Sequence, residues 1–228
     1  IDPTTGFISS FIPTRYESIE KTKELISKFN HISYHETEDL FCIEVDYQKI
    51  RPDTKLWNQR VWQIYTYGDR IDAHKENSQW QSKQVWLTQE FKQLFKEYDM
   101  DYVKDLERQI SAQTEADFFR RFLHLLKLTL QMRNSRTVSS ADASENQNPN
   151  RENDYIISPA KNRNGTFYDS RRDYDSWPEN ADANGAYNIA RKGLIMLKNL
   201  KGGTDEKRIC DISTETWLKF VEDISKDR

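Results

Sequence analysis

The chain has 228 residues with a hydrophobic content of 36%, including six Trp, eleven Tyr and eleven Phe, and a formal net charge of −3. It is long enough to bury the core of one large or two small domains, and its two cysteines, Cys42 and Cys210, lie far apart, which argues against a disulfide framework and a structural zinc site. An autonomous nucleic-acid-binding domain is usually basic, so nucleic-acid binding here would need cations gathered locally.

No apolar run approaches the length that spans a membrane, and no secretory signal peptide is visible. We therefore expect a protein of a reducing, cytoplasmic compartment with no membrane partner. The chain begins at Ile1, which suggests the interior of a longer protein or a trimmed terminus. Helical and strand-like patterns are interspersed, which predicts a mixed α+β fold.

Apolar periodicity places the first predicted elements. In chain order we expect an extended segment, a helix, two strands and a second helix at residues 7–11, 18–29, 40–46, 59–67 and 88–98. The first strand rests on the alternation of Phe41, Ile43 and Val45 with other residues. Gly68-Asp69 marks the turn after the second strand. Thr88 is the expected N-cap of the second helix.

The longest predicted helix covers residues 114–132, with Thr114 as its N-cap and Asp117 in its first turn. An apolar stripe runs along it and contains Phe119, Leu123, Leu126 and Leu130. This pattern predicts a core helix.

Outside its apolar stripe the same helix is basic, because no acidic residue occurs from Phe118 to Arg136. Four polar residues share one helical face by spacing: Arg120, His124, Lys127 and Gln131. The simplest interpretation is a solvated face, and contact with phosphates is the alternative.

Arg133 continues the buried stripe just where the helix is expected to end, so its side chain should point at the protein body or into a cleft. In the structural interpretation it pairs with a buried carboxylate. In the functional interpretation it contacts a phosphate.

Beyond Arg136, residues 137–153 are rich in Ser, Asn, Asp and Glu, which is typical of a surface loop or a disordered insertion, and we assign them no chemistry. Paired strands are expected at 154–157 and 165–168, joined by the turn signal Asn164-Gly165. A closing amphipathic helix is expected at 213–224.

Before that closing helix, Asp182 lies among small residues where another amphipathic helix begins. The expected apolar stripe of this helix contains Ala186, Ile189, Ala190, Leu194, Ile195 and Leu197. A carboxylate at a helix entry either caps the first amides or turns into a cleft to hold a divalent cation. Local sequence leaves both interpretations open.

Four motifs occur in a specific order: Leu130–Ser135 (LQMRNS), Asp154–Pro159 (DYIISP), Phe167–Arg171 (FYDSR) and Ala181–Tyr187 (ADANGAY). With them, the N-terminal DPTTGF and the WQIY and GDR segments make the chain similar, over nearly its whole length, to the C-terminal part of type V-A CRISPR-associated, RNA-guided DNA endonucleases.

The resemblance implies a domain organisation. Residues 1–12 would be the end of a preceding RuvC segment or the start of the Nuc domain. Residues 13–178 would be the Nuc domain, built of helices and short strands. Residues 179–228 would be the third segment of an RNase H-like RuvC nuclease with C-terminal helices.

The resemblance also implies site residues. The family's third catalytic carboxylate falls on Asp182, which would be a Mg²⁺ ligand, its cleavage arginine on Arg133, and a neighbouring acidic position on Asp154. Nucleic-acid contacts are expected at Arg133, Asn134, Ser135 and Arg136. The chain departs from the family at Asn180, at Asn188 and in the polar insertion after Arg136, none of which replaces a carried-over residue.

The implied partners are a guide CRISPR RNA, target DNA and the remaining RuvC segments of one polypeptide, in the cytoplasm of a prokaryotic cell. Two-metal phosphodiester hydrolysis needs several converging carboxylates. One aspartate is insufficient, so we expect the chain alone to be inactive and to bind Mg²⁺ weakly.

Two other functions stay open. The chain could be a non-catalytic module that steers single-stranded nucleic acid through aromatic and basic residues. It could also be a structural domain in which Asp182 caps a helix and Arg133 forms an internal ion pair.

Overall fold

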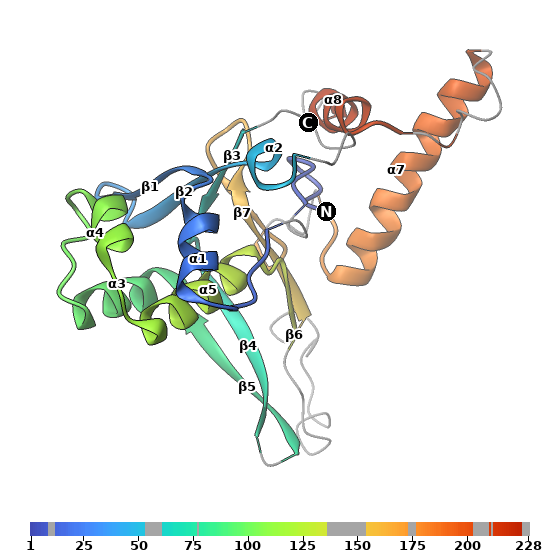
Figure 1. Ribbon diagram of the computed structural model, residues 1–228. Coiled ribbons are helices and arrows are strands. Elements are labelled where there is room, and N and C mark those ends of the chain that lie inside the picture. The colour runs from blue at the N-terminus through green and yellow to red at the C-terminus, as the bar shows by residue number, and fades with distance from the viewer. Residues whose placement is uncertain are drawn as a thin grey trace.

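The computed structural model describes residues 1–8, 12–52, 61–76, 78–135, 154–172, 177–202, 210 and 212–224. Within these residues, helices and strands are interspersed along the chain and the strands form small antiparallel sheets (Figure 1). The predicted α+β class is confirmed. The described helices include none that is long and apolar enough to cross a bilayer.

The first sheet has the order β1-β2-β3, with β1 at Phe29–His35, β2 at Leu40–Asp46 and β3 at Val61–Tyr65. The predicted strand at 40–46 is confirmed with these bounds, and β3 confirms the strand expected at 59–67, whose first two residues lie outside the described residues. Strand β2 leads into the short helix α2 (Tyr47–Ile50).

Helix α1 (Ile19–Ile26) is capped by Ser18, whose side chain accepts a hydrogen bond from the amide of Lys21. The helix expected at 18–29 is therefore present but shorter. Phe29 begins β1, because pairing with β2 supplies its backbone partners instead of another helical turn. Of the extended segment expected at 7–11, residues 7–8 form no strand and the rest lie outside the described residues.

The core lies where α3 (Leu87–Glu97) and α5 (Ala116–Leu130) pack together. Their most deeply buried aromatic side chains are Phe91, Phe95, Phe118, Phe119 and Phe122. The predicted core helix is thus confirmed. The short helix α4 (Leu106–Ala112), which was not predicted, contributes Leu106 and Ile110 to the same core.

Both predicted threonine caps are wrong. Trp86 and Glu115 occupy the N-cap positions of α3 and α5, and neither makes a side-chain capping bond. Thr88 is buried, and its hydroxyl bonds instead to the Thr66 hydroxyl at 2.8 Å and the Thr66 carbonyl at 3.0 Å. Thr114 precedes the cap of α5. At Thr88, hydrogen bonds to Thr66 on another element therefore replace the predicted capping bond within the helix.

Strands β4 (Asp69–Glu76) and β5 (Gln79–Trp86) form a two-stranded ribbon that extends away from the core (Figure 1). Its register runs from Asp69 opposite Trp86 to Glu76 opposite Gln79. The ribbon was not predicted because it is mostly polar, with Ile71 and Val85 buried near its base.

The third sheet has the order β6-β7-β8, with β6 at Arg133–Ser135, β7 at Asp154–Lys161 and β8 at Phe167–Asp169. The predicted hairpin is confirmed. Gly165 has a φ of 75° in its turn, a conformation that glycine adopts without strain. The expected polar loop 137–153 lies outside the described residues.

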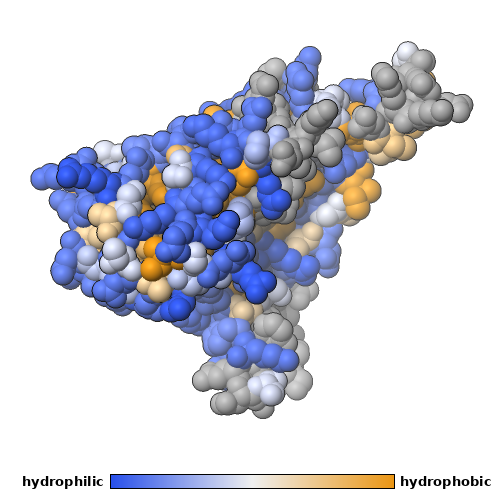
Figure 2. Space-filling view, viewed as in Figure 1, coloured by the Kyte–Doolittle hydropathy of each residue, from blue (hydrophilic) through white to orange (hydrophobic). Residues whose placement is uncertain are grey.

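Helix α7 (Ala181–Lys201) projects from the body (Figure 1). Helix α8 (Thr214–Ile224) lies beside its middle, where Lys192 is over the ring of Trp217 and Lys198 is over the ring of Phe220. The burial predicted for the stripe of α7 is wrong for most of its members. Ile189, Leu194 and Leu197 are 73%, 51% and 54% exposed, and hydrophobic residues are visible along this helix in Figure 2.

The buried face of α7 is instead mostly polar and contains Asn184, Asn188, Arg191 and Ile195. Its polar side chains reach the N-terminal segment, where Asn184 donates to the carbonyl of Ile1 at 2.9 Å and Arg191 donates to the carbonyl of Pro3 at 2.7 Å. Buried backbone carbonyls need hydrogen-bond donors, which the polar face of α7 has and its apolar face lacks. The polar face therefore packs against the N-terminal segment. The predicted closing helix is confirmed as α8.

Candidate active site

The residues Arg133, Asp154 and Asp182 come together although they lie in three different elements. Arg133 begins β6, Asp154 begins β7 and Asp182 lies in the first turn of α7. Nε of Arg133 is 3.4 Å from Oδ1 of Asp154, and Nη1 of Arg133 is 4.0 Å from Oδ1 of Asp182.

Strand pairing sets the first of these contacts. Arg133 lies opposite Ile156, and Ser135 lies opposite Asp154, so Arg133 and Asp154 are diagonal neighbours across the β6–β7 pair. Diagonal side chains on one sheet face are within reach when one of them is long. Helix α5 ends at Leu130, and β6 begins soon afterwards at Arg133, so the end of the helix fixes where this strand starts.

Asn180, and not Asp182, is the N-cap of α7. The Asn180 side chain accepts a hydrogen bond of 2.9 Å from the amide of Ala183. The interpretation of Asp182 as a helix cap is therefore wrong. Asp182 lies in the first turn of the helix with a side chain that is 88% exposed, where the helix dipole favours a negative charge.

Arg133 is held loosely. Its side chain is 59% exposed, its contacts with Asp154 are long, at 3.4 and 3.5 Å, and its contact with Asp182, at 4.0 Å, is at the outer limit for an ion pair. Such solvent-screened pairs contribute only about 0–1 kcal/mol. Oδ1 of Asp154 is buried and accepts no hydrogen bond from the described residues. The arginine is therefore free enough to engage a ligand, and Asp154 orients it.

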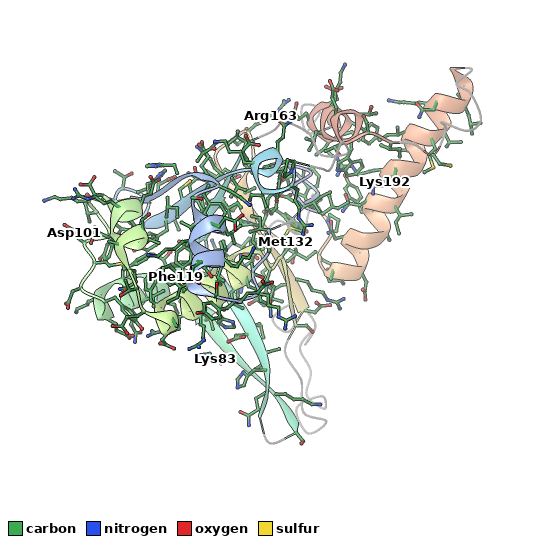
Figure 3. All side chains as sticks on the ribbon, in the orientation of Figure 1. Lys83, Asp101, Phe119, Met132, Arg163 and Lys192 are labelled. Atoms are coloured by element: carbon green, nitrogen blue, oxygen red, sulfur yellow. The ribbon has the colours of Figure 1, made fainter. Side chains whose placement is uncertain are left out.

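A cavity of about 380 Å³ opens beside this cluster, between α7 and the β6–β7 pair. Its wall includes Arg133, Met132, Ile156, Asn184, Asn188 and Lys192. Figure 3 labels Met132 on the body and Lys192 on α7, the two sides of this space. Arg133 and Lys192 give the cavity a cationic rim.

The segment that follows Arg133 is divided between interior and surface. Asn134 is fully buried, and its Oδ1 accepts hydrogen bonds from the Ile71 amide at 2.9 Å and from Gln131 at 3.1 Å. Its amide therefore ties β6 to β4. Ser135 is exposed on β6, and Arg136 lies outside the described residues.

The described residues do not by themselves provide a complete Mg²⁺ site. None of them form a group of three or more His, Cys, Asp or Glu side chains placed to hold a metal ion. Asp182 is an exposed oxygen donor of the type that Mg²⁺ prefers. The arrangement fits a single ligand that needs carboxylates from elsewhere.

A second charged cluster, which sequence reasoning missed, joins the start of β4 to the end of β8. Arg171 donates to Asp69 at 2.9 Å and to Asp169 at 2.8 Å, and both carboxylates are buried. Burial alone would raise the pKa of Asp69, but hydrogen bonds from Arg171, Tyr155 and Gln84 outweigh it and hold that pKa below its ordinary value. The only sequence signal was the presence of these residues in the GDR and FYDSR segments.

Arg70, next to Asp69, is completely buried, and burial lowers its pKa to about 10. It donates to the backbone carbonyls of Tyr67, Asp69 and Thr129. This arginine links the ribbon to α5 and has a structural role.

The chain matches a known protein family. The family model NUC, described as a nuclease domain, matches residues 1–172. The match includes Arg133 and Asp154 and ends before Asp182. It covers most of the chain and supports a role related to nuclease action. The chain therefore belongs to the NUC family of nuclease domains.

Proposed function

We propose that this chain is the Nuc domain and third RuvC segment of a type V-A CRISPR-associated, RNA-guided DNA endonuclease of the prokaryotic cytoplasm. The observation that carries the proposal is the convergence of Arg133 with Asp154 and Asp182 beside a cavity. The proposed Nuc domain, residues 13–178, overlaps the family match, and the proposed RuvC segment, residues 179–228, begins at the cap of α7.

In this proposal Asp182 is one Mg²⁺ ligand, and earlier RuvC segments of the same polypeptide supply the others. When bound, Mg²⁺ activates water and stabilises the leaving oxygen of a phosphodiester. The guide CRISPR RNA selects the target DNA by base pairing. The exposure of Asp182 supports this role, because its carboxylate is accessible to ligands from outside the chain.

The exposed apolar face of α7 supports the same proposal. Ile189, Leu194, Leu197 and Leu200 are each at least half exposed on one side of the helix. A contiguous apolar face of this kind usually marks an interface. The remaining RuvC segments are its proposed partner, and their docking would bring their carboxylates toward Asp182 at the start of the same helix.

Arg133 would contact the scissile phosphate. Its guanidinium offers several donors in a planar fork that matches phosphate geometry. The loose pairing with Asp154 and Asp182 keeps this group near the site without holding it in place.

In the longer nuclease, Arg133→Ala should lower the single-turnover cleavage rate about 100- to 1,000-fold, as expected for loss of a donor to the transition state. Arg133→Lys keeps the charge but loses the fork, so it should recover only part of the rate. Target-DNA affinity, measured in parallel, should change little. An equal loss of affinity and rate would favour a strand-steering role over a catalytic one.

The isolated chain should not cleave DNA in the presence of Mg²⁺, because the described residues do not complete a metal site. The measurement is incubation of the purified chain with labelled single- and double-stranded DNA, with EDTA as the control. Metal-dependent cleavage that disappears in Asp182→Ala would show that the chain holds a complete site and would overturn the division into segments.

A further inference from the structure

The N-terminal loop, residues 1–7, lies between β7 and α7, the two elements that carry Asp154 and Asp182 (Figure 1). Two backbone hydrogen bonds of 2.9 Å close the loop, one from the amide of Asp2 to the carbonyl of Phe7 and one from the amide of Gly6 to the carbonyl of Asp2. Residues 2–7 are all buried. The loop is therefore a closed unit inside the protein.

Asp2 is the centre of this loop. Its side chain is fully buried and accepts hydrogen bonds from the amide and hydroxyl of Thr4, at 2.7 and 2.8 Å, and from the hydroxyl of Thr5 at 2.6 Å. The hydroxyl of Ser158 in β7 donates a further one. A buried carboxylate needs donors of this kind. The Asp2 side chain therefore fixes the loop to β7.

The carbonyls on either side of Asp2 hold α7. Asn184 donates to the carbonyl of Ile1 at 2.9 Å, and Arg191 donates to the carbonyl of Pro3 at 2.7 Å. The two donors lie on one face of the helix, about two turns apart. Two separated attachments of this kind fix both the position and the direction of α7. The residue that is bonded to β7 therefore also sets where α7 lies.

Helix α8 closes the other side of this junction. Gly6 has a φ of 75°, and a Cβ atom there would lie 2.8 Å from Leu218 and 3.2 Å from Trp217 of α8. The guanidinium of Arg191 lies over the Trp217 ring, 5.2 Å from its centre. Only a glycine permits this close approach of α8 to the loop. The packing leaves little room for α7 to shift at Arg191.

We propose that Asp2 is a positioning residue for the candidate site. Through its bond to β7 and the carbonyls beside it, Asp2 holds α7 in place and so keeps Asp182 within reach of Arg133. The 4.0 Å contact between Asp182 and Arg133 is too weak to hold the helix by itself. The consequence for cleavage rests on the proposed function, whereas the position of α7 is a property of the chain itself.

The first test measures the distance between β6 and α7 by pulsed electron paramagnetic resonance on the 228-residue chain. Spin labels are attached at the exposed positions Ser135→Cys and Ala190→Cys, in a Cys210→Ser background that removes the exposed native cysteine. This parent chain should give one narrow distance distribution. Asp2→Ala and the milder Ser158→Ala should widen it roughly 2-fold, because α7 then moves on its remaining contacts.

Two buried arginines provide a matched control. Arg191→Met removes the donor to the Pro3 carbonyl and should widen the distribution, and Arg191→Lys should restore it in part because lysine can still donate. Arg70→Met removes an arginine that also donates to backbone carbonyls, but those of Tyr67, Asp69 and Thr129. It should lower Tm and leave the width unchanged. Each variant is measured below its own Tm.

The second test is single-turnover cleavage by the longer nuclease over a range of Mg²⁺ concentrations. Ser158→Ala should lower the rate about 10- to 100-fold, since a displacement of about 1 Å at a reacting centre has an effect of this size. The Mg²⁺ concentration for half-maximal rate should rise, and target-DNA affinity should not change. Asp2→Asn, which keeps an acceptor oxygen, should retain more activity than Asp2→Ala. The rate of Arg70→Met should stay within about 2-fold of wild type.

The positioning role of Asp2 fails if the parent chain gives a broad distribution, if Asp2→Ala and Ser158→Ala leave it narrow, or if Arg70→Met widens it equally. These outcomes are separable from the proposed function. Wider distributions together with unchanged cleavage in Asp182→Ala would support the positioning of α7 and contradict the metal site. Loss of cleavage in Asp182→Ala with narrow distributions in the Asp2 and Ser158 variants would do the reverse.

Discussion

Asp182→Ala should abolish cleavage by the longer nuclease while leaving its binding to target DNA intact. The exposed carboxylate contributes little to the stability of this chain, since Asn180 caps the helix and the contact with Arg133 is 4.0 Å long. Its loss should therefore cost no more than about 1 kcal/mol, the contribution of a charge in the first turn of a helix. As the proposed metal ligand, however, it would support charge stabilisation in the transition state worth about 4 kcal/mol, which corresponds to roughly 1,000-fold in rate.

The measurement is single-turnover cleavage of labelled target DNA across a range of Mg²⁺ concentrations, with binding measured separately. Asp182→Asn is the matched variant, because it keeps size and polarity but removes the charge. Asn180→Ala serves as the structural control. It should destabilise α7 by about 1 kcal/mol, as for other lost caps, and affect cleavage less. Unchanged cleavage in Asp182→Ala would remove Asp182 from the metal site.

Arg171→Ala should destabilise the fold by about 3–5 kcal/mol, because it leaves two buried carboxylates without their shared cation. Asp69 and Asp169 are 1% and 3% exposed, and Arg171 bonds to both. In a protein of this size each kcal/mol lowers Tm by about 2–4 °C. Thermal or urea unfolding of the 228-residue chain measures the effect.

Arg172→Ala is the control for this variant. Arg172 is the next residue along the chain, its side chain is 74% exposed, and it lies 4.0 Å from the same Asp169 carboxylate. Its loss should change the free energy of unfolding by less than about 1 kcal/mol. If the two variants unfolded alike, the buried cluster would not be the source of the stability.

The same cluster predicts a pH dependence. The pKa of Asp69 in the folded chain lies below its ordinary value, so the carboxylate stabilises the fold only while it is charged. That stability is fully present above the unfolded pKa of about 3.9 and is lost as pH falls through the folded value. Stability of wild type should therefore fall more steeply below about pH 4 than that of Arg171→Ala.

Periodicity alone predicted those helices and strands in which apolar residues recur at a regular spacing and are buried along the whole element. The alternation in β2 and the apolar stripe of α5 each face the core throughout their length, so local pattern and tertiary environment agree. The ribbon β4–β5 was missed because it extends beyond the core, where no burial imposes an alternating pattern.

The candidate site was predicted by resemblance more than by pattern. The motifs around Arg133, Asp154 and Asp182 identified these residues, but nothing in the spacing required them to meet. Their meeting depends on the register of β6 with β7 and on the position of α7. Asn134, by contrast, was expected to contact nucleic acid but does not lie at the surface. Arg133 beside it is exposed, whereas the Asn134 side chain is buried and accepts a hydrogen bond from Ile71 of β4.

The sequence by itself determined the α+β class, the core helix and the identity of the candidate site residues, because composition, periodicity and motifs are local properties. Only the tertiary structure decided which face of α7 is buried and which residue caps it. Asn184 and Arg191, on the polar face of that helix, donate hydrogen bonds to the carbonyls of Ile1 and Pro3, which lie far away in the sequence. The apolar face of the helix is therefore exposed to solvent. A buried carbonyl must find a donor wherever the fold provides one, and no local pattern records that partner.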